Sequence, residues 1–256
     1  MMPLFRPLIL HFDSLPSTNT EATQQAMRGA PEGLCIVARE QTVGRGRRER
    51  LWASPADGGL YFSIVLRPRL ELVAWPLLTL MAALAVTDAL VEACAITELD
   101  IKWPNDIVAR ERKVCGILAE TVETAAGRAC IVGIGINLRE GALPPDLREV
   151  ATSVEALAGA RPEREAVLRA LVNSIEHRYM KLTGPGGAQE TVRAWSRRSS
   201  YAEGKHVRVA TGTEIFEGVT RGLEPDGALR VETAGGTIKV VRAGDVTALR
   251  AMEIER

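Results

Sequence analysis

The chain has 256 residues, of which 46% are hydrophobic, and its 32 basic and 32 acidic residues cancel to a net charge of zero. A chain of this length can bury a core without disulfides or metals, most simply as one main domain with a smaller second one. Because the net charge is zero, the overall electrostatic field of the protein would not hold it on nucleic acid or on an anionic membrane.

The cysteines and the N-terminus indicate a reduced protein. Cys35, Cys94, Cys115 and Cys130 lie far apart without a C-x-x-C pair, and the N-terminus does not resemble a signal peptide. We therefore expect a cytoplasmic protein. The most apolar run, residues 72–86, ends before the roughly 20 residues that a bilayer requires, so it predicts a buried helix and no membrane span.

The first third of the chain predicts a helix followed by two strands. In STNTEATQQAM, Thr18 and Glu21 fit a capping box, so a helix should run from there to Gly29. Strands are expected at residues 34–38 and from residue 59 to Pro68, joined by an arginine-rich loop.

The middle of the chain predicts a long helix and then more strands. Pro76 suits the first turn of a helix that reaches about Ala95 and packs a wide apolar surface against a sheet. Four extended segments follow in quick succession: LDIKW, DIVA, KVCGILAETVE and CIVGIGINL. Because short loops connect them, they favour a mixed or antiparallel sheet.

The last hundred residues predict helices and then a second domain. Two or three helices are expected between Ser153 and Ser199, with a break at GPGG, residues 184–187. From about Ala202 the pattern changes to short strands with a D-G turn at residues 226–227, which predicts a small β-barrel. The fold class is thus α+β, a mixed sheet packed with helices, with domains at residues 1–200 and 201–256.

One face of the predicted strand IVGIGINL carries almost no side-chain atoms. Alternation places Gly133, Gly135 and Asn137 on one face of a strand and apolar side chains on the other. Glycine in a strand marks close approach of a ligand or of another part of the backbone. The glycine face could therefore be the floor of a pocket, or it could pack tightly against a helix.

The segment KWPND lies at the end of a strand, where a rigid Trp-Pro corner fixes the directions of two charged side chains. Lys102 can neutralise a phosphate and Asp106 can hold a metal or a substrate N–H, but an exposed hairpin with a salt bridge explains the pattern equally well. Lys113 opens the next strand, where alternation predicts that it shares a face with Cys115 and Ile117.

The loop GRGRRER, residues 44–50, matches neither the Walker A motif nor the dinucleotide fingerprint. Its glycines let backbone N–H groups approach an anion, and its arginines supply bidentate donors. In isolation the loop is better explained as a solvated basic turn or a nucleic-acid contact. The three histidines lack metal-site spacing, and no G-x-S-x-G segment is present.

Taken in chain order, five segments resemble biotin protein ligase: STN (17–19), EQTVGRGRRERLW (40–52), KWPNDI (102–107), KVCGIL (113–118) and GIGINL (133–138). The resemblance implies a catalytic domain like those of class II aminoacyl-tRNA synthetases and biotin ligases, followed by an SH3-like β-barrel. It also implies two half-reactions. Biotin and Mg-ATP give biotinyl-5′-AMP and pyrophosphate, and a lysine of the biotin carboxyl carrier protein of acetyl-CoA carboxylase then takes the biotin.

The resemblance also implies roles for individual residues. Those expected at the biotin site are Ser17, Thr18, Asn19, Gln41, Arg45, Gly46, Arg47, Lys113 and Gly116. Those expected at the ATP or adenylate site are Arg47, Trp52, Asn105, Lys113, Gly133, Gly135 and Asn137. Those expected at the reaction centre are Arg45, Arg47, Lys102, Asp106 and Lys113. The residues that hold Mg²⁺ stay unassigned.

Two other functions are compatible with these motifs. A lipoate or octanoate transferase would share the catalytic fold, and a non-catalytic biotin or nucleotide sensor would share the binding residues. Only sixteen residues precede STN, which leaves no room for the DNA-binding domain of some family members, so we expect no DNA binding. Edge strands of homologous sheets can pair, which leaves a homodimer open.

The arginine loop is expected to be a lid. Because water hydrolyses an acyl adenylate while substrates must still enter, the loop should be mobile in the free protein and resistant to proteases with biotin and ATP bound. Glu49 stands where the family loop usually has a further glycine, and it adds a negative charge near a phosphate site.

We therefore expect Glu49 to loosen closure of the loop. Replacing it in a Glu49→Gly variant should slow the release of free biotinyl-5′-AMP, measured by chromatography of the released nucleotide. An unchanged release rate would reject this role for Glu49.

Overall fold

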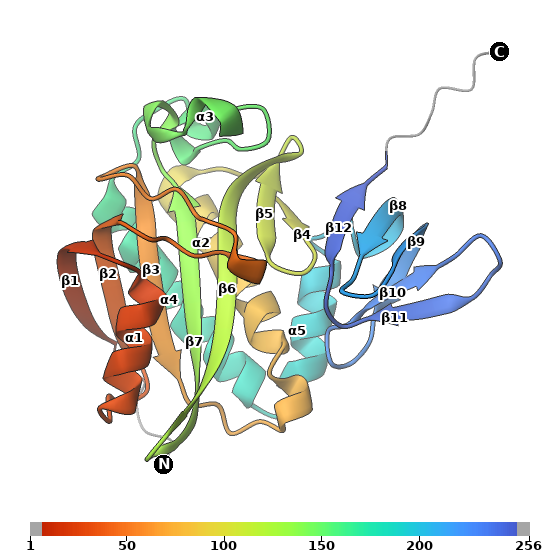
Figure 1. Cartoon of the computed structure of the whole chain (residues 1–256), viewed down its shortest axis with the longest axis horizontal. Helices are drawn as coiled ribbons and strands as arrows, with labels where there is room; N and C mark the ends of the chain where they lie inside the picture. Colours follow the sequence, from red (N-terminus) through yellow and green to blue (C-terminus); the bar gives the residue numbers. More distant parts are fainter. Residues whose placement is uncertain (1–6, 250–256) are drawn as a thin grey trace.

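The computed structural model describes residues 7–249 of the chain. A seven-stranded sheet forms the centre of a large domain, and a five-stranded antiparallel sheet forms a small C-terminal barrel beside it (Figure 1). This arrangement confirms the predicted fold class.

The large sheet is mixed, because β1 runs parallel to β2 while the other neighbouring strands pair antiparallel. From one edge to the other its strands are β1 (Leu8–Leu15), β2 (Leu34–Gln41), β3 (Gly59–Leu66), β7 (Gly127–Asn137), β6 (Arg112–Thr124), β5 (Asp106–Ala109) and β4 (Asp100–Lys102). The sequence analysis predicts all of these except β1. That strand lies at an edge with every residue exposed or half-buried, so its apolar pattern is weak.

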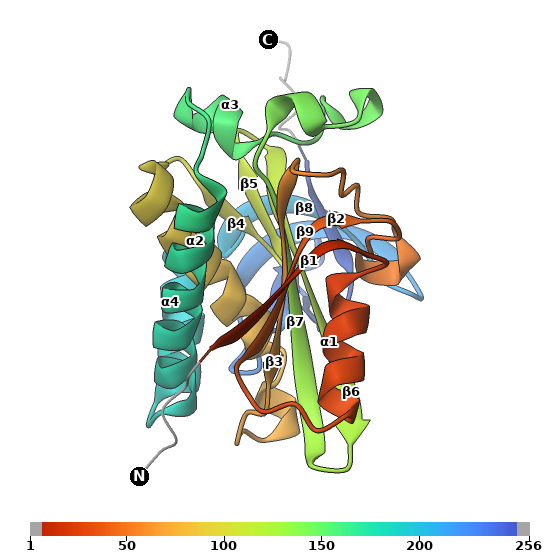
Figure 2. The same ribbon diagram turned by 90° about the vertical axis from the view of Figure 1, so that its left-hand side faces the viewer.

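Helices cover both faces of the sheet (Figure 2). On one face, α1 packs Ala22 and Ala26 against Ile36 and Val65. The layer on the other face holds the main core. The helices are α1 (Thr18–Met27), α2 (Leu77–Cys94), α3 (Val154–Ala158), α4 (Arg164–Thr183) and α5 (Gly187–Ser196). The predicted break between α4 and α5 at residues 184–187 is confirmed.

Helix α2 is the predicted buried helix, and Pro76 directly precedes its first residue. The stretch Leu72–Cys94 is long and apolar enough to cross a membrane, yet 67% of its most apolar window is buried inside the structure. Packing against the sheet and α4 therefore accounts for its composition.

The start of α1 differs from the predicted capping box. Ser17 is the N-cap residue and makes no side-chain cap bond, while Thr18 is already helical. The Thr18 hydroxyl donates to Oε1 of Gln41 (3.1 Å), and the Glu21 carboxylate accepts from Gln25 (2.7 Å). The predicted capping box is wrong because both side chains have other partners.

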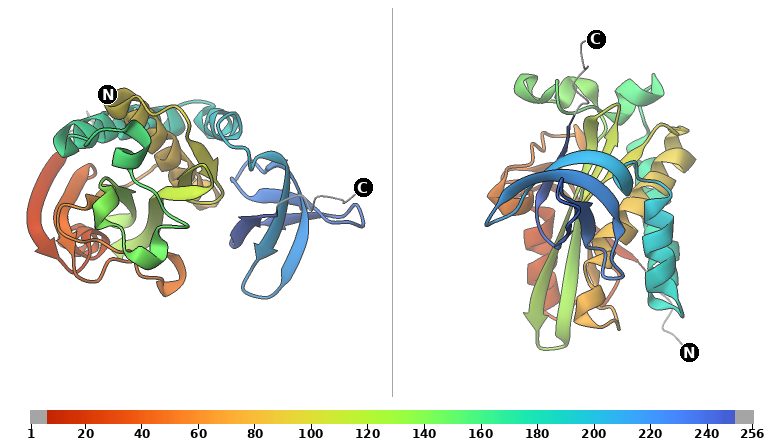
Figure 3. Two further views of the ribbon diagram at one scale, coloured as in Figure 1. Left: turned by 90° about the horizontal axis from the view of Figure 1, so that it is seen from above. Right: turned by 90° about the vertical axis from the view of Figure 1, so that its right-hand side faces the viewer.

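The C-terminal barrel (residues 203–248) contains the predicted short strands, with the D-G turn at Gly227 (φ 85°). In spatial order the strands are β11 (Ile238–Val241), β10 (Leu229–Glu232), β9 (Ile215–Leu223), β8 (Glu203–Ala210) and β12 (Asp245–Ala248). The barrel docks beside β4 and α5 (Figure 3), where Nε1 of Trp103 donates to the Gly227 carbonyl at 3.0 Å. The division at residue 200 stays a prediction.

A cluster of one acid and two arginines ties three helices together. Asp88 on α2 accepts from Nε of Arg178 on α4 (2.6 Å) and from Nη1 of Arg198, just after α5 (2.5 Å). Burial raises the pKa of Asp88, but the hydrogen bonds and the positive charges of the two arginines together lower it by more, so the pKa lies below its usual value.

Asp88→Asn should lower the free energy of unfolding by about 2 kcal/mol at pH 7, since two arginines lose a half-buried anion. A carboxylate with a depressed folded pKa contributes stability above its unfolded pKa of about 4 and loses it as pH falls through the folded pKa. Urea unfolding at pH 7 and pH 3 should therefore show a difference between variant and wild type that shrinks at low pH. An equal difference at both pH values would contradict this account.

Candidate active site

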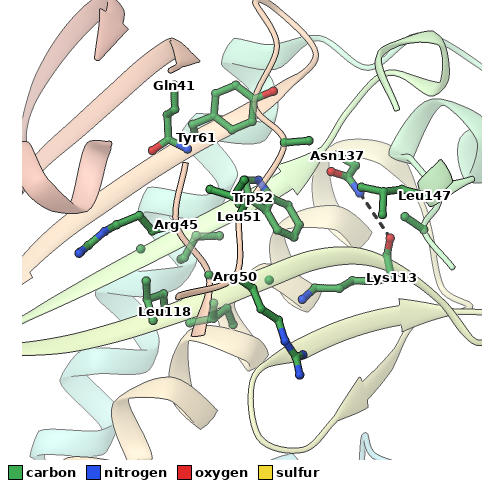
Figure 4. Close-up of a pocket in the computed structure, with 18 of the residues that line it drawn as sticks. Gln41, Arg45, Arg50, Leu51, Trp52, Tyr61, Lys113, Leu118, Asn137 and Leu147 are labelled. Carbon is green, nitrogen blue, oxygen red and sulfur yellow. Dashed lines mark hydrogen bonds between the residues drawn. The ribbon is translucent and has the colours of Figure 1, made fainter. Parts of the chain in front are cut away.

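A cavity of about 240 Å³ lies between the start of α1, the loop after β2 and the ends of β5, β6 and β7 (Figure 4). Its lining includes every site residue predicted from the sequence except Lys102: Ser17, Thr18, Asn19, Gln41, Arg45, Gly46, Arg47, Trp52, Asn105, Asp106, Lys113, Gly116, Gly133, Gly135 and Asn137. The motifs are thus brought together in one place.

One end of the cavity is a buried polar network. Oε1 of Gln41 accepts from the Thr18 backbone N–H (2.8 Å), and Nδ2 of Asn19 donates to Oε2 of Glu120 (2.7 Å). The Ser63 hydroxyl lies 2.8 Å from Oγ1 of Thr18 and 2.6 Å from Oδ1 of Asn19. Because these groups hold one another in place, this end presents fixed donors and acceptors.

The network includes residues that the sequence analysis missed. Ser63 on β3 is fully buried, and Ser54 accepts from Nε2 of Gln41 at 2.8 Å. The only signal for Ser63 is a polar residue in the middle of the apolar strand GLYFSIVL. Glu120 gives no signal, since a single acidic residue near the end of a strand motif is common on a solvated face.

The glycines form the floor of the cavity. A Cβ at Gly133 would lie 2.1 Å from Oδ1 of Asn19, and one at Gly135 would lie 2.5 Å from Nε1 of Trp52. The face predicted as bare is therefore filled by α1 at one glycine and by the Trp52 indole at the other. Nε1 of Trp52 is buried without a hydrogen-bond partner among residues 7–249, so it remains available as a donor.

The charged centre lies where β5 meets β6. Nζ of Lys113 lies 2.7 Å from Oδ1 of Asp106 and 5.2 Å from the centre of the Trp52 ring. The pairing between β5 and β6 shifts by one residue after Ile107, which is a β-bulge. As a result Lys113 points to the Gly116 side and away from Cys115 and Ile117, so the predicted face is wrong.

Lys102 lies across from Asp106 in the β4–β5 pair, beside the cavity but outside its lining. Burial lowers the pKa of its ammonium, and the negative charge of Asp106 opposes this shift. The Asp106 carboxylate therefore lies close to both lysines, Lys102 and Lys113.

The arginine loop is folded over the cavity. The backbone N–H of Trp52 donates to the Gly44 carbonyl (2.9 Å), and Arg45 forms an ion pair with Glu120. Nη1 of Arg47 donates to Oδ1 of Asn105 at 3.2 Å. Glu49 is exposed and has φ 61°, in the left-handed region that favours glycine.

A wall that the sequence analysis missed closes the side beyond Asn137. It consists of apolar residues from the loop after β7: Ala142, Leu143, Pro144, Leu147, Val150 and Ala151. Nδ2 of Asn137 holds this wall by donating to the carbonyl of Thr152 at 3.1 Å. The segment has no periodic pattern, so only the structure assigns it to the cavity.

The chain is similar to proteins of one family along nearly its whole length. Residues 11–137 match the biotin/lipoate A/B protein ligase family, and residues 204–247 match the biotin protein ligase C-terminal domain. The biotin–[acetyl-CoA-carboxylase] ligase of Paracoccus denitrificans is 36% identical over 90% of this chain and 96% of its own length. The chain belongs to the biotin protein ligase family.

Other biotin protein ligases share the sequence and the fold. The bifunctional ligase/repressor of Bacillus subtilis is 37% identical over 92% of this chain and 72% of its own length. The biotin protein ligase of Aquifex aeolicus, solved with biotin and ATP, superposes with a TM-score of 0.82 at 30% identity, covering 95% of this chain and 99% of its own. The similarity therefore includes both domains.

The shared carboxylate gives a prediction about titration. Because Asp106 raises the pKa of Lys102 against the effect of burial, Asp106→Asn should lower that pKa further. NMR titration of ¹³C-labelled lysine, with a Lys102→Arg variant to assign the signal, would measure the change. A Lys102 pKa that stays constant or rises in Asp106→Asn would contradict the proposed coupling.

Proposed function

We propose that this cavity activates biotin with ATP to biotinyl-5′-AMP and then transfers biotin to a lysine of a biotin carboxyl carrier protein. The protein is an ATP-dependent biotin ligase, because its relatives are biotin–[acetyl-CoA-carboxylase] ligases and a structural neighbour carries biotin and ATP. The match of residues 204–247 to the biotin ligase C-terminal domain favours biotin over lipoate. The observation that carries the site assignment is the convergence of a buried polar network and a charged centre on one cavity.

The polar end would bind the ureido ring of biotin. A urea has a carbonyl acceptor and two N–H donors, which require fixed partners of both kinds. Thr18, Asn19 and Gln41 are held by one another, by Ser63 and by Glu120, so they would need little reorganisation when biotin binds. The Ser17 hydroxyl is not used as a helix cap and is free to join them.

The charged centre would carry the first half-reaction. The biotin carboxylate attacks the α-phosphorus, a new C–O–P linkage forms, and the bond to the β-phosphate breaks to release pyrophosphate. Two anions must approach each other, so positioned positive charge supplies most of the stabilisation. Lys113 and Arg47 line the cavity, with Lys102 beside it, and Asp106 and Asn105 orient them.

The adenylate would extend over the glycine floor towards the wall at residues 142–151. Trp52 offers an unpaired buried N–H and lies over Gly135, while the wall supplies apolar contacts for a base. Asn137 would position the wall. In the second half-reaction the carrier amine attacks the carbonyl carbon of the mixed anhydride, loses a proton and releases AMP.

Mg²⁺ would bind together with ATP, coordinated by the phosphates. Residues 7–249 contain no group of three or more His, Cys, Asp or Glu side chains that could hold a metal. Mg²⁺ is commonly held by one or two carboxylates together with substrate phosphates. Of the two carboxylates in the cavity lining, Asp245 is already paired with three loop arginines, which leaves Asp106. This donor set fits, with Asp106 as the carboxylate nearest Lys113. The ion would neutralise phosphate charge.

A cytoplasmic location, the homodimer and the absence of DNA binding stay predictions. The four cysteines are free thiols, as expected for a reducing compartment. Sequence-specific, salt-sensitive DNA binding would overturn the last of these predictions.

The activity is tested by incubating the protein with biotin, ATP, magnesium and a carrier domain. Biotinylated carrier is the expected product. Lipoyl transfer would instead support a lipoate ligase, and biotin binding without turnover would support a sensor. The carrier mass distinguishes all three outcomes.

Lys113→Gln should lower kcat for adenylate formation by about 100-fold or more, since it removes a charge from the centre. Pyrophosphate release would be measured, with Lys181→Gln as the control because Lys181 is exposed in the last turn of α4. An activity within threefold of wild type in Lys113→Gln would remove Lys113 from the reaction centre.

A further inference from the structure

One carboxylate of the C-terminal barrel contacts three arginines of the loop over the cavity. Asp245, the first residue of β12, lies 3.8 Å from Nη1 of Arg47 and 3.4 Å from Nη1 of Arg48, and it forms a close ion pair with Arg50. Two of these guanidinium groups also donate to barrel carbonyls, Arg47 to Gly244 (3.2 Å) and Arg48 to Ala210 (3.3 Å). The tip of the loop is therefore docked on the barrel.

The base of the loop is held by the catalytic domain instead. The backbone N–H of Trp52 donates to the Gly44 carbonyl, and Arg45 pairs with Glu120 on β6. The tip of the loop is thus held by the C-terminal barrel and its base by the catalytic domain. Arg47 bridges the two, because it also donates to Asn105 in the cavity.

The charges at the tip are unbalanced. Three guanidinium groups face one carboxylate of the barrel, and with the exposed Glu49 counted the tip keeps one positive charge in excess beside a cavity proposed to bind a triphosphate. Like charges this close repel one another, so the tip would spread into solvent without an anion among them. The Asp245 side chain is 26% exposed, and solvent therefore screens its attraction to the arginines less than at an open surface.

We propose that Asp245 is a positioning residue that docks the loop tip on the barrel and thereby holds Arg47 over the reaction centre. The proposal rests on the proposed function, in which Arg47 acts on the phosphates and the loop retains the adenylate. The barrel thus takes part in the reaction through the loop, without contacting biotin itself.

The docking is tested first without substrates, where the loop is expected to be more mobile than with biotin and ATP bound and the barrel contacts alone restrain its tip. Trypsin cleaves after the loop arginines, so Asp245→Asn should be cut in the loop about tenfold faster than wild type. Glu217→Gln is the matched control, since Glu217 is a carboxylate of the same barrel whose ion-pair partner is the barrel residue Arg208. Equal loop cleavage in Asp245→Asn and wild type, or equal acceleration in the control, would overturn the proposal.

The second test separates positioning from general stability. Asp245→Asn should raise the KM for ATP about tenfold, leave the KM for biotin within twofold and increase the release of free biotinyl-5′-AMP, and Asp245→Glu should partly restore these values. Equal increases in both KM values, with a lower melting temperature, would indicate a structural role and overturn the proposal.

A third variant removes the same ion pairs by changing the loop arginines in place of the barrel carboxylate. Arg48→Gln/Arg50→Gln leaves the barrel intact and should also raise adenylate release, so it gives an answer even if Asp245→Asn does not fold. Unchanged release in this double variant would overturn the proposal. A wild-type protein without ligase activity would refute the proposed function, whereas the trypsin assay would still decide on docking.

Discussion

The absence of side chains on one face of β7 is the constraint on which the cavity depends. At Gly133 and Gly135 the backbone of the sheet can be approached as closely as Asn19 and Trp52 approach it. With a methyl group at either position, α1 or the indole would have to move outward. Both ends of the cavity, polar and charged, are built on this bare strip, while the opposite face of β7 belongs to the main core.

Two kinds of electrostatic environment meet above this strip. At the polar end, buried neutral groups and the half-buried Glu120 satisfy one another, which gives a rigid binding surface. At the other end cations outnumber anions, and Asp106 and Asp245 each serve several of them. The first arrangement suits the neutral ring and the second suits the phosphates of the proposed function.

Most of the fold follows from local sequence patterns, since strong alternation and short turn motifs predict the central strands. Most of the site follows from the resemblance of five motifs to the biotin protein ligase family, which implies fifteen residues that line the cavity. The failures have physical causes. Edge strand β1 has little to bury, Thr18 bonds to Gln41 at the end of β2 in place of capping, and a bulge turns Lys113 over. Glu120, Ser63 and the wall at residues 142–151 act through contacts distant in sequence, which no local pattern contains.

The contacts of Asp245 also bear on the order in which the chain is made. Arg47, Arg48 and Arg50 leave the ribosome about 195 residues before their carboxylate partner. All strands of the catalytic sheet are present as soon as β7 is made. The loop tip gains its partner, Asp245, only when β12, the last described strand, completes the barrel. A nascent chain therefore has a binding cavity before it has an anchored cover, and the cover is the last part of the site to be assembled.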